Sequence, residues 1–223
     1  MLKGLKQFNN FIFDMDGTLV NSSEEVLSCL KKACEINNAQ INLQNFSSEI
    51  IGPPLREIIQ SIILDYDNED LVAKITSDFR RIYDNDEKDN SSLYKNIYEW
   101  LIQLKEQNKR LFLATNKPAI PTKRLIKKLG LNMFEDVYTI DRYSEKQISK
   151  SEMISEIIEK YNLEKSKTIM IGDAPSDIKA AHVSNIKAVG VLWGYGNHKK
   201  VLIETSDLIL ELKDLKELEK VKK

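Results

Sequence analysis

Two aspartates near the start of the chain lie two positions apart, and a pair of this kind could take part directly in a reaction. Asp14 and Asp16 follow the apolar residues 11–13 and precede Gly17. The acids would share one face if the strand continued, and Gly17 would bend the chain and keep both at an open strand end. Carboxylates this close repel each other, so one holds a proton or both face a cation. The pair predicts a nucleophile and a proton shuttle, and an ordinary acidic turn is the alternative.

Two later segments carry polar groups at the same kind of position. Residues 111–115 are an apolar run that ends in Thr115, and residues 168–172 form another that is followed by Asp173. Asp177 comes four residues later, where a helix is expected to open. Ligands bind beyond the carboxyl ends of the strands in parallel sheets, so these groups should converge with Asp14 on one crevice.

The four segments together resemble a known superfamily. Lys150 lies in the first turn of a helix predicted between the two later strands, and Lys146 is a nearby rival for the same role. The order Asp-x-Asp-Gly-Thr, strand-end Thr, Lys and Gly-Asp-x-x-x-Asp resembles the haloacid-dehalogenase-like phosphohydrolases, and among them the phosphoglycolate-phosphatase-like branch. The resemblance covers residues 11 to about 210.

The resemblance implies a role for each matching residue. It implies Asp14 as a nucleophile that forms an aspartyl phosphate, Asp16 as the general acid and base, and Thr115 and Lys150 as catalytic partners. It also implies that phosphate is bound by Gly17, Thr18 and Asn116, and that Mg²⁺ is bound by Asp14, Asp173, Asp177 and the Asp16 carbonyl. Because Mg²⁺ prefers oxygen ligands, these residue types suit that ion. Asp173 and Asp177 could instead serve only the helix that follows them.

Composition agrees with an ordinary enzyme domain. The chain has 223 residues, 42% hydrophobic and 30% charged, with a net charge of -1. This balance favours neither nucleic acid nor an anionic membrane as a partner. Cys29 and Cys34 fit neither a disulfide framework nor a zinc site, and each is expected to be a small buried residue of a reducing, cytoplasmic compartment. A monomer or a homodimer is expected.

Hydrophobic periodicity predicts an α/β protein with two regions, one of alternating strands and helices and one of helices alone. Strands that alternate with helices after residue 94 predict a doubly wound parallel sheet of the Rossmann-like type seen in this superfamily. Three helical stripes between residues 22 and 84, the first opened by a predicted Ser22 to Glu25 capping box, predict a small helical-bundle cap. We expect residues 1–18 and 89–223 to form the core domain and residues 19–88 the cap.

Residues outside the four motifs bear on the substrate. Residues 52–56 resemble a cap loop that reaches toward substrate, so Arg56 could meet a substrate carboxylate, although it could also be a surface arginine. Residues 193–196, an aromatic and glycine-containing turn, either border the site or form a structural corner. The resemblance implies a phosphatase for a small phosphorylated metabolite, with 2-phosphoglycolate as a candidate. A phosphosugar mutase and a catalytically idle binding relative are the alternatives.

Overall fold

The chain folds into two compact units. The structure is a computed structural model that describes residues 2–85, 90–143 and 145–216. One unit contains Met1–Asn21, Ser92–Gly194 and His198–Lys223, and the other contains Ser22–Ser91 with Tyr195–Asn197. We call them the sheet unit and the helical unit. Each is described by itself below.

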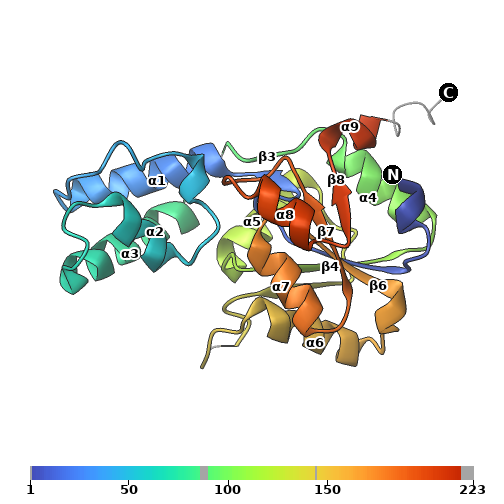
Figure 1. Cartoon of the computed structure of the whole chain (residues 1–223). Coiled ribbons are helices and arrows are strands. Elements are labelled where there is room, and N and C mark those ends of the chain that lie inside the picture. Colours follow the sequence, from blue (N-terminus) through green and yellow to red (C-terminus); the bar gives the residue numbers. More distant parts are fainter. Residues whose placement is uncertain (1, 86–89, 144, 217–223) are drawn as a thin grey trace. The chain divides into compact units, whose positions relative to one another are not determined.

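A six-stranded parallel sheet forms the centre of the sheet unit (Figure 1). The order of its strands is β5-β4-β1-β6-β7-β8, and every neighbouring pair is parallel. The predicted strands are therefore confirmed within one or two residues at their ends. Their bounds are β1 (Asn10–Phe13), β4 (Arg110–Thr115), β5 (Asp136–Thr139), β6 (Thr168–Gly172), β7 (Lys187–Val191) and β8 (Leu208–Leu210).

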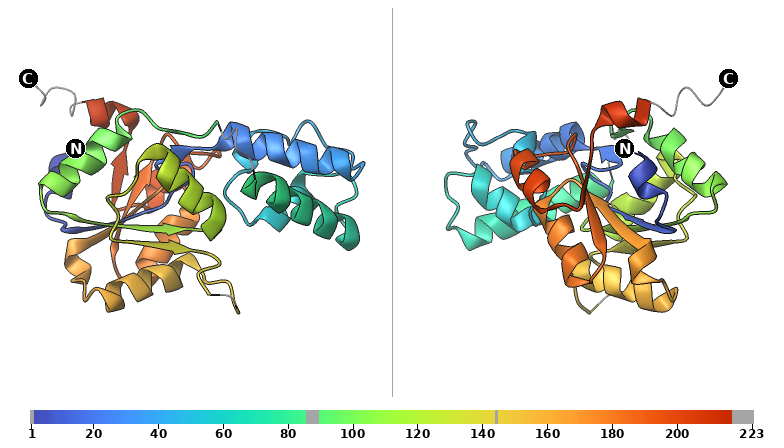
Figure 2. Two further views of the ribbon diagram at one scale, coloured as in Figure 1. Left: turned by 180° about the vertical axis from the view of Figure 1, so that it is seen from behind. Right: turned by 45° about the vertical axis from the view of Figure 1, so that its right-hand side comes forward.

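Helices cover both faces of this sheet (Figures 1 and 2). Phe11 and Phe13 point to the face that α4 (Ile97–Glu106), α5 (Ala119–Leu129) and α9 (Leu212–Leu215) cover. Ile12 points to the opposite face, which is covered by α6 (Lys150–Lys160), α7 (Pro175–Val183) and α8 (Lys199–Thr205). A strand buried on both faces reads as a continuous apolar run, which is the pattern that residues 11–13 show. The expected doubly wound architecture is confirmed.

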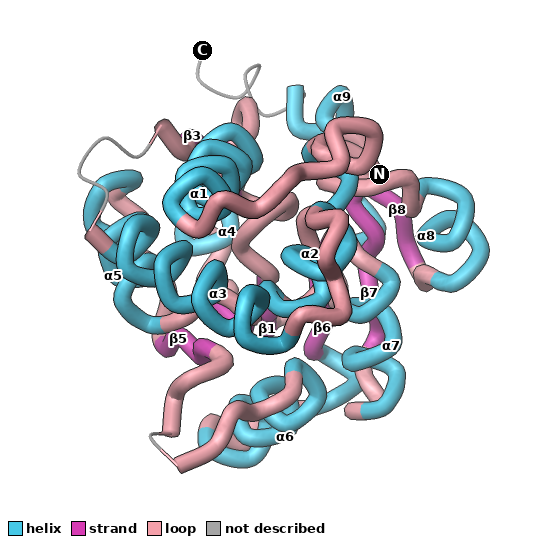
Figure 3. Tube along the Cα trace, turned by 90° about the vertical axis from the view of Figure 1, so that its left-hand side faces the viewer, coloured by secondary structure: helices cyan, strands magenta, loops and turns pink. Residues whose placement is uncertain are grey.

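The helical unit consists of α1 (Ser23–Ile36), α2 (Leu55–Ile62) and α3 (Glu69–Asp84), which Figure 3 draws as cyan coils. The three apolar stripes of the sequence meet in one core of their own. Cys29 and Cys34 are buried in that core as reduced thiols, in agreement with the prediction that each is a small buried residue. Burial raises the pKa of the Cys34 thiol to about 11, so it stays protonated and behaves as a small apolar side chain.

The predicted capping box at the start of α1 is wrong. Ser22 is the N-cap residue, but its side chain makes no capping hydrogen bond. Its backbone N–H donates to the Tyr195 hydroxyl at 2.5 Å. The buried Glu25 carboxylate accepts from the Asn90 backbone N–H at 3.1 Å and from Cys29 Sγ at 3.3 Å. Contacts with residues far along the chain have replaced the local pattern.

Two further differences concern short segments. The sequence indicated no strand between residues 20 and 84 and a linker over residues 84–92, yet β2 (Val20–Asn21) pairs antiparallel with β3 (Ser92–Leu93). Strands of two residues are too short to leave a periodic signal. The lysine-rich tail over residues 213–223 alternates with Glu and Leu, which predicts a solvated amphipathic helix. It is described only as far as α9 (Leu212–Leu215), and residues 217–223 lie outside the described part of the chain. Among the described residues, no helix combines the length and apolar character needed to cross a membrane.

Candidate active site

The register of the sheet brings the ends of three strands together. Phe13 of β1 lies beside Leu113 of β4 and Ile171 of β6. The chain therefore leaves these strands at the same edge, where Asp14 directly follows β1 and Asp173 directly follows β6. Thr115, the last residue of β4, is buried at this edge as well. Polar residues at the ends of three strands thus gather at the edge of the sheet where the sequence predicted them to converge.

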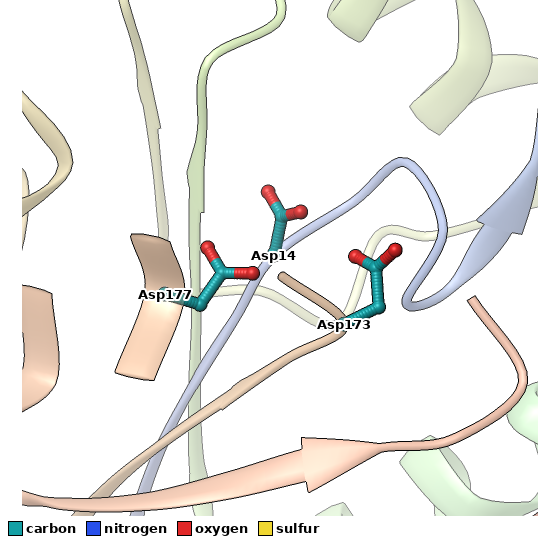
Figure 4. Close-up of side chains that lie close together, drawn as sticks. All are labelled: Asp14, Asp173 and Asp177. Carbon is teal, nitrogen blue, oxygen red and sulfur yellow. The ribbon is translucent and has the colours of Figure 1, made fainter. Parts of the chain in front are cut away.

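Three buried carboxylates form a cluster at this edge (Figure 4). Asp14, Asp173 and Asp177 each offer an oxygen, and these oxygens lie within 4.8 Å of one another. Asp177 comes from the first turn of α7, which Pro175 opens as the sequence suggested. The acids that the four motifs singled out from opposite ends of the chain therefore lie side by side.

Lys150 is the cation that faces this cluster. Its Nζ lies 2.8 Å from Asp14 Oδ1 and 2.5 Å from Asp177 Oδ1. A capping box between Ser149 and Glu152 sets the start of α6, so Lys150 occupies the first position of the helix. The rival Lys146 is 63% exposed and pairs with Glu152 instead.

Burial and charge act in opposite directions on these groups. Burial raises the pKa of Asp14 to about 7, Lys150 lowers it, and Asp177 and Asp16 raise it. Burial by itself lowers the pKa of Lys150, but Asp14 and Asp177 raise it by more, so the ammonium stays charged. The cluster contains three carboxyl groups and one ammonium, so its four side chains carry a net negative charge when the acids are ionised.

Asp173 is packed tightly from two sides. Thr18 Oγ1 donates to Asp173 Oδ1 at 3.1 Å. Gly17, at a φ of 80°, and Gly194 both lie so close that an added Cβ would clash with the Asp173 side chain. Trp193 Nε1 donates to the Thr18 carbonyl at 3.0 Å. Residues 193–194 of the aromatic turn therefore border the acidic cluster.

Asp177 has both of its carboxylate oxygens engaged. Oδ1 accepts from Lys150, and Oδ2 accepts from the Ala174 backbone N–H at 3.0 Å, which caps α7. A Cβ at Gly172 would clash with the Asp177 carboxylate. The side chain therefore holds Lys150 and the N-terminus of α7 in place while it adds negative charge to the cluster.

The turn after β4 orients Thr115. The Lys117 backbone N–H donates to Thr115 Oγ1 at 3.1 Å, so this oxygen already accepts one hydrogen bond. A hydroxyl that accepts in this way keeps its own hydrogen for a further acceptor, such as a phosphoryl oxygen. Asn116, the next residue, is exposed. Thr115 ends the strand that pairs with β1, and Asn116 follows it.

Sequence reasoning missed Lys117. Its Nζ lies 3.1 Å from both Oδ1 and Oδ2 of Asp16, and its side chain is only 4% exposed. The signal available was its position two residues past Thr115, at the end of a strand that neighbours β1. Lysines are usually solvated, so position along the strand was the only clue.

Arg56 belongs to the helical unit. It lies in the first turn of α2, where it forms an exposed ion pair with Glu69 at the start of α3. The loop before it ends at Pro54, the N-cap of α2, as the helix-breaking pattern predicted.

The acidic cluster has the donor set that suits a hard divalent cation. Its donors are all carboxylate oxygens, which Mg²⁺ prefers over nitrogen and sulfur. Burial of Asp14 beside two further acids is unfavourable without more positive charge, and a divalent cation supplies that charge. Asp14, Asp173 and Asp177 each offer one oxygen to such an ion.

Comparisons with known proteins agree with this geometry. The profile of the haloacid dehalogenase-like hydrolase family matches residues 11–191. A phosphoglycolate phosphatase of Nitrosococcus oceani is 29% identical over 221 residues, or 95% of this chain and 97% of the relative. The tyrosine-protein kinase PtkA of Mycobacterium tuberculosis is 25% identical over 83% of this chain and 62% of the kinase.

The fold is also found in solved structures. A predicted phosphoglycolate phosphatase from Haemophilus somnus 129pt superposes with a TM-score of 0.80 at 24% identity, covering 96% of this chain and 98% of the other. The match of the family profile extends over all four motifs, from the strand before Asp14 to β7 beyond Asp177. The resemblance seen in the motifs is thus confirmed, and the chain belongs to the haloacid dehalogenase-like hydrolase family.

Proposed function

We propose that this protein is a Mg²⁺-dependent phosphatase that hydrolyses a small phosphorylated metabolite. The observation that carries the proposal is the position of Asp14, a buried carboxylate at a strand end that faces Lys150 beside Asp173 and Asp177. A buried nucleophile, a nearby ammonium and an all-oxygen cation site are the three features that phosphoryl transfer through an aspartate requires.

The proposed reaction has two halves. In the first, an Asp14 oxygen attacks phosphorus, the bond to the leaving oxygen breaks, and Asp16 gives that oxygen a proton. In the second, Asp16 takes a proton from water, which attacks the aspartyl phosphate and releases phosphate and free Asp14. Asp16 is 21% exposed whereas Asp14 is 10% exposed, so Asp16 is the better placed of the two to exchange protons with solvent.

Charge is stabilised by groups that are already in place. Lys150 and the Thr115 hydroxyl would meet the phosphoryl oxygens, with Asn116 as a further donor. The backbone N–H groups of Gly17 and Thr18, which the resemblance assigns to phosphate, donate to the Val20 and Met15 carbonyls. When bound, Mg²⁺ offsets the negative charge that the nucleophile shares with the phosphoryl group. The chain's own residues then need only position the reactants and move one proton in each half.

For the substrate, 2-phosphoglycolate is the first candidate. Phosphoglycolate phosphatase is the name of the Nitrosococcus relative, and the resemblance of residues 52–56 to a substrate-facing loop offers Arg56 for a carboxylate. The candidate is small and carries both the phosphate and the carboxylate that such a site would recognise.

The test is a panel of phosphate esters assayed with purified protein. With Mg²⁺ present, we expect phosphate release from p-nitrophenyl phosphate and from at least one small metabolite. We expect chelation of the metal and the Asp14→Asn substitution each to abolish it. Product analysis with sugar phosphates separates hydrolysis from isomerisation by a mutase. An Asp14→Asn variant with wild-type turnover would reject the mechanism, and binding of esters without turnover would favour an idle relative.

A further inference from the structure

We propose that Lys117 is a positioning residue that holds the Asp16 carboxyl group where it can pass a proton to the leaving oxygen. The inference rests on the proposed phosphatase function and adds a residue to it. Lys117 lies outside the four motifs.

The Lys117 ammonium faces both oxygens of the Asp16 carboxylate. The two distances from Nζ are equal, at 3.1 Å each. A contact with one oxygen would leave the carboxyl plane free to turn, whereas contact with both opposes rotation about the last side-chain bond. Charge-assisted hydrogen bonds of this kind are about twice as strong as neutral ones. The pair therefore restricts the direction in which Asp16 presents its oxygens.

Hydrogen bonds hold the backbone near Asp16. The orientation of its carboxyl group therefore depends on rotation of the side chain. The Val20 backbone N–H donates to the Met15 carbonyl at 2.9 Å, and the Gly17 N–H donates to the Val20 carbonyl at 2.9 Å. Asp16 and Val20 also form an isolated bridge. These bonds close the loop after β1 but leave the Asp16 carboxyl group to its side-chain contacts.

Lys117 is itself anchored at the other end of the contact. Its backbone N–H donates to Thr115 Oγ1, and Thr122 Oγ1 donates to the Pro118 carbonyl at 2.7 Å. These hydrogen bonds hold the turn between β4 and α5, and the buried Lys117 side chain extends from it to Asp16. A charged group is seldom buried to this degree unless it is paired.

The site thus uses separate lysines for its two N-terminal acids. Lys150 contacts Asp14 and Asp177, and Lys117 contacts Asp16. A lysine that stabilised the phosphoryl group would affect every substrate. A lysine that positions the proton donor should matter most where the leaving oxygen needs a proton, because general acid catalysis contributes little when the leaving group is already a stable anion.

The experiment compares two substrates that differ in the leaving group. The first is p-nitrophenyl phosphate, whose leaving group departs as a stable anion. The second is the best alkyl phosphate found in the metabolite panel. For Lys117→Met we expect kcat with the alkyl phosphate to fall at least 30-fold and kcat with p-nitrophenyl phosphate to fall less than 5-fold, with KM changed less than 3-fold for both. Lys160→Met, which removes a lysine that pairs with Asp136 away from the site, is the matched control.

A double-mutant cycle identifies the partner. If Lys117 acts through Asp16, Lys117→Met combined with Asp16→Asn should be no slower with the alkyl phosphate than Asp16→Asn alone. Multiplicative losses would overturn the inference, and so would an equal loss of kcat with both substrates or a loss confined to KM. A wild-type protein that releases phosphate from no ester would instead reject the proposed function, which separates the two failures.

Two precautions keep the outcome independent of folding. The double variant removes both charges of the pair, so it leaves no unpaired charge to destabilise the protein. Lys117→Arg restores a cation and should recover at least a third of the alkyl phosphatase activity that Lys117→Met loses. Failure of the arginine variant to recover any activity, while its thermal unfolding matches that of the wild type, would also count against positioning of Asp16 by charge.

Discussion

The Lys150 ammonium lies 2.8 Å from the Asp14 carboxylate, so the proposed nucleophile has a cation beside it. Both side chains are at most 10% exposed, which strengthens their interaction because little water screens it. The same ammonium also contacts Asp177, which in turn caps α7. The nucleophile, the cation and the start of a helix are thereby linked into one charged group of the sheet unit.

Removal of the Lys150 charge should therefore cost both activity and stability. For Lys150→Met we expect kcat to fall by about 10²–10³-fold, because the charge that faces the phosphoryl group is lost. The free energy of unfolding should fall by roughly 3–5 kcal/mol, since Asp14 and Asp177 are left buried without their partner. Steady-state kinetics and calorimetry measure the two effects. Lys146→Met, at the exposed rival position, should change neither, and equal losses in both variants would contradict this assignment.

The pH dependence of the free energy of unfolding should show that the charged form of Asp14 is unfavourable in the folded protein. The folded protein raises the pKa of this carboxyl group from 3.8 to about 7, chiefly through burial. The folded state therefore binds this proton more tightly than the unfolded state does. The contribution of protonated Asp14 to the free energy of unfolding is fully present below about pH 4 and is lost as the pH rises through 7. Without metal, we expect Asp14→Asn to be more stable than wild type at pH 8 by about 1–3 kcal/mol.

Differential scanning calorimetry in metal-free buffer is the measurement for that prediction. The difference between Asp14→Asn and wild type should shrink steadily as the pH is lowered from 8 to 4. Mg²⁺ at pH 8 should raise the melting temperature of the wild type more than that of the variant, because binding to the folded state stabilises it. A difference that stays constant across this range would show that Asp14 is not held in an unfavourable charged state.

The close approach of Gly194 to Asp173 predicts a defect in metal affinity. A Cβ at residue 194 would clash with the Asp173 side chain, and overpacking of this kind typically costs 1–3 kcal/mol. For Gly194→Ala we expect the Mg²⁺ concentration for half-maximal activity to rise by about 10–100-fold, the equivalent of that cost. Gly4→Ala, whose nearest neighbour is the Leu208 side chain at 3.8 Å, is the control. Unchanged metal dependence in Gly194→Ala would mean that Asp173 does not bind the ion.

Arg56 offers a prediction about selectivity. Arg56→Gln should raise KM for 2-phosphoglycolate by about 10–100-fold, since a charge-assisted bond to a carboxylate is worth roughly 1.5–3 kcal/mol. It should leave KM for p-nitrophenyl phosphate, which has no carboxylate, within 2-fold. Stability should hardly change, because the Arg56–Glu69 pair is exposed. Arg81→Gln, which breaks another exposed pair of the helical unit, is the control. A parallel rise in KM for both substrates would exclude a carboxylate contact.

The main strands and helices, and the acidic residues of the candidate site, could be predicted from the sequence. Apolar runs placed β1, β4 and β6, and helical stripes placed α1, α2 and α3, because burial imposes a period of two or 3.6 residues on the residues that form them. The parallel order of strands then required that Asp14 and Asp173 leave the sheet at one edge. The acids of the cluster could therefore be named before any contact was known.

Which side chains pair with one another, by contrast, depends on the tertiary structure. Lys117 meets Asp16, Thr18 meets Asp173, and Glu25 meets Asn90. Side chains separated by tens of residues are brought together by the register of neighbouring strands and by the packing of loops, and neither leaves a periodic trace along the chain. A short local pattern such as the one at Ser22 therefore fails where a distant partner binds the same group more favourably.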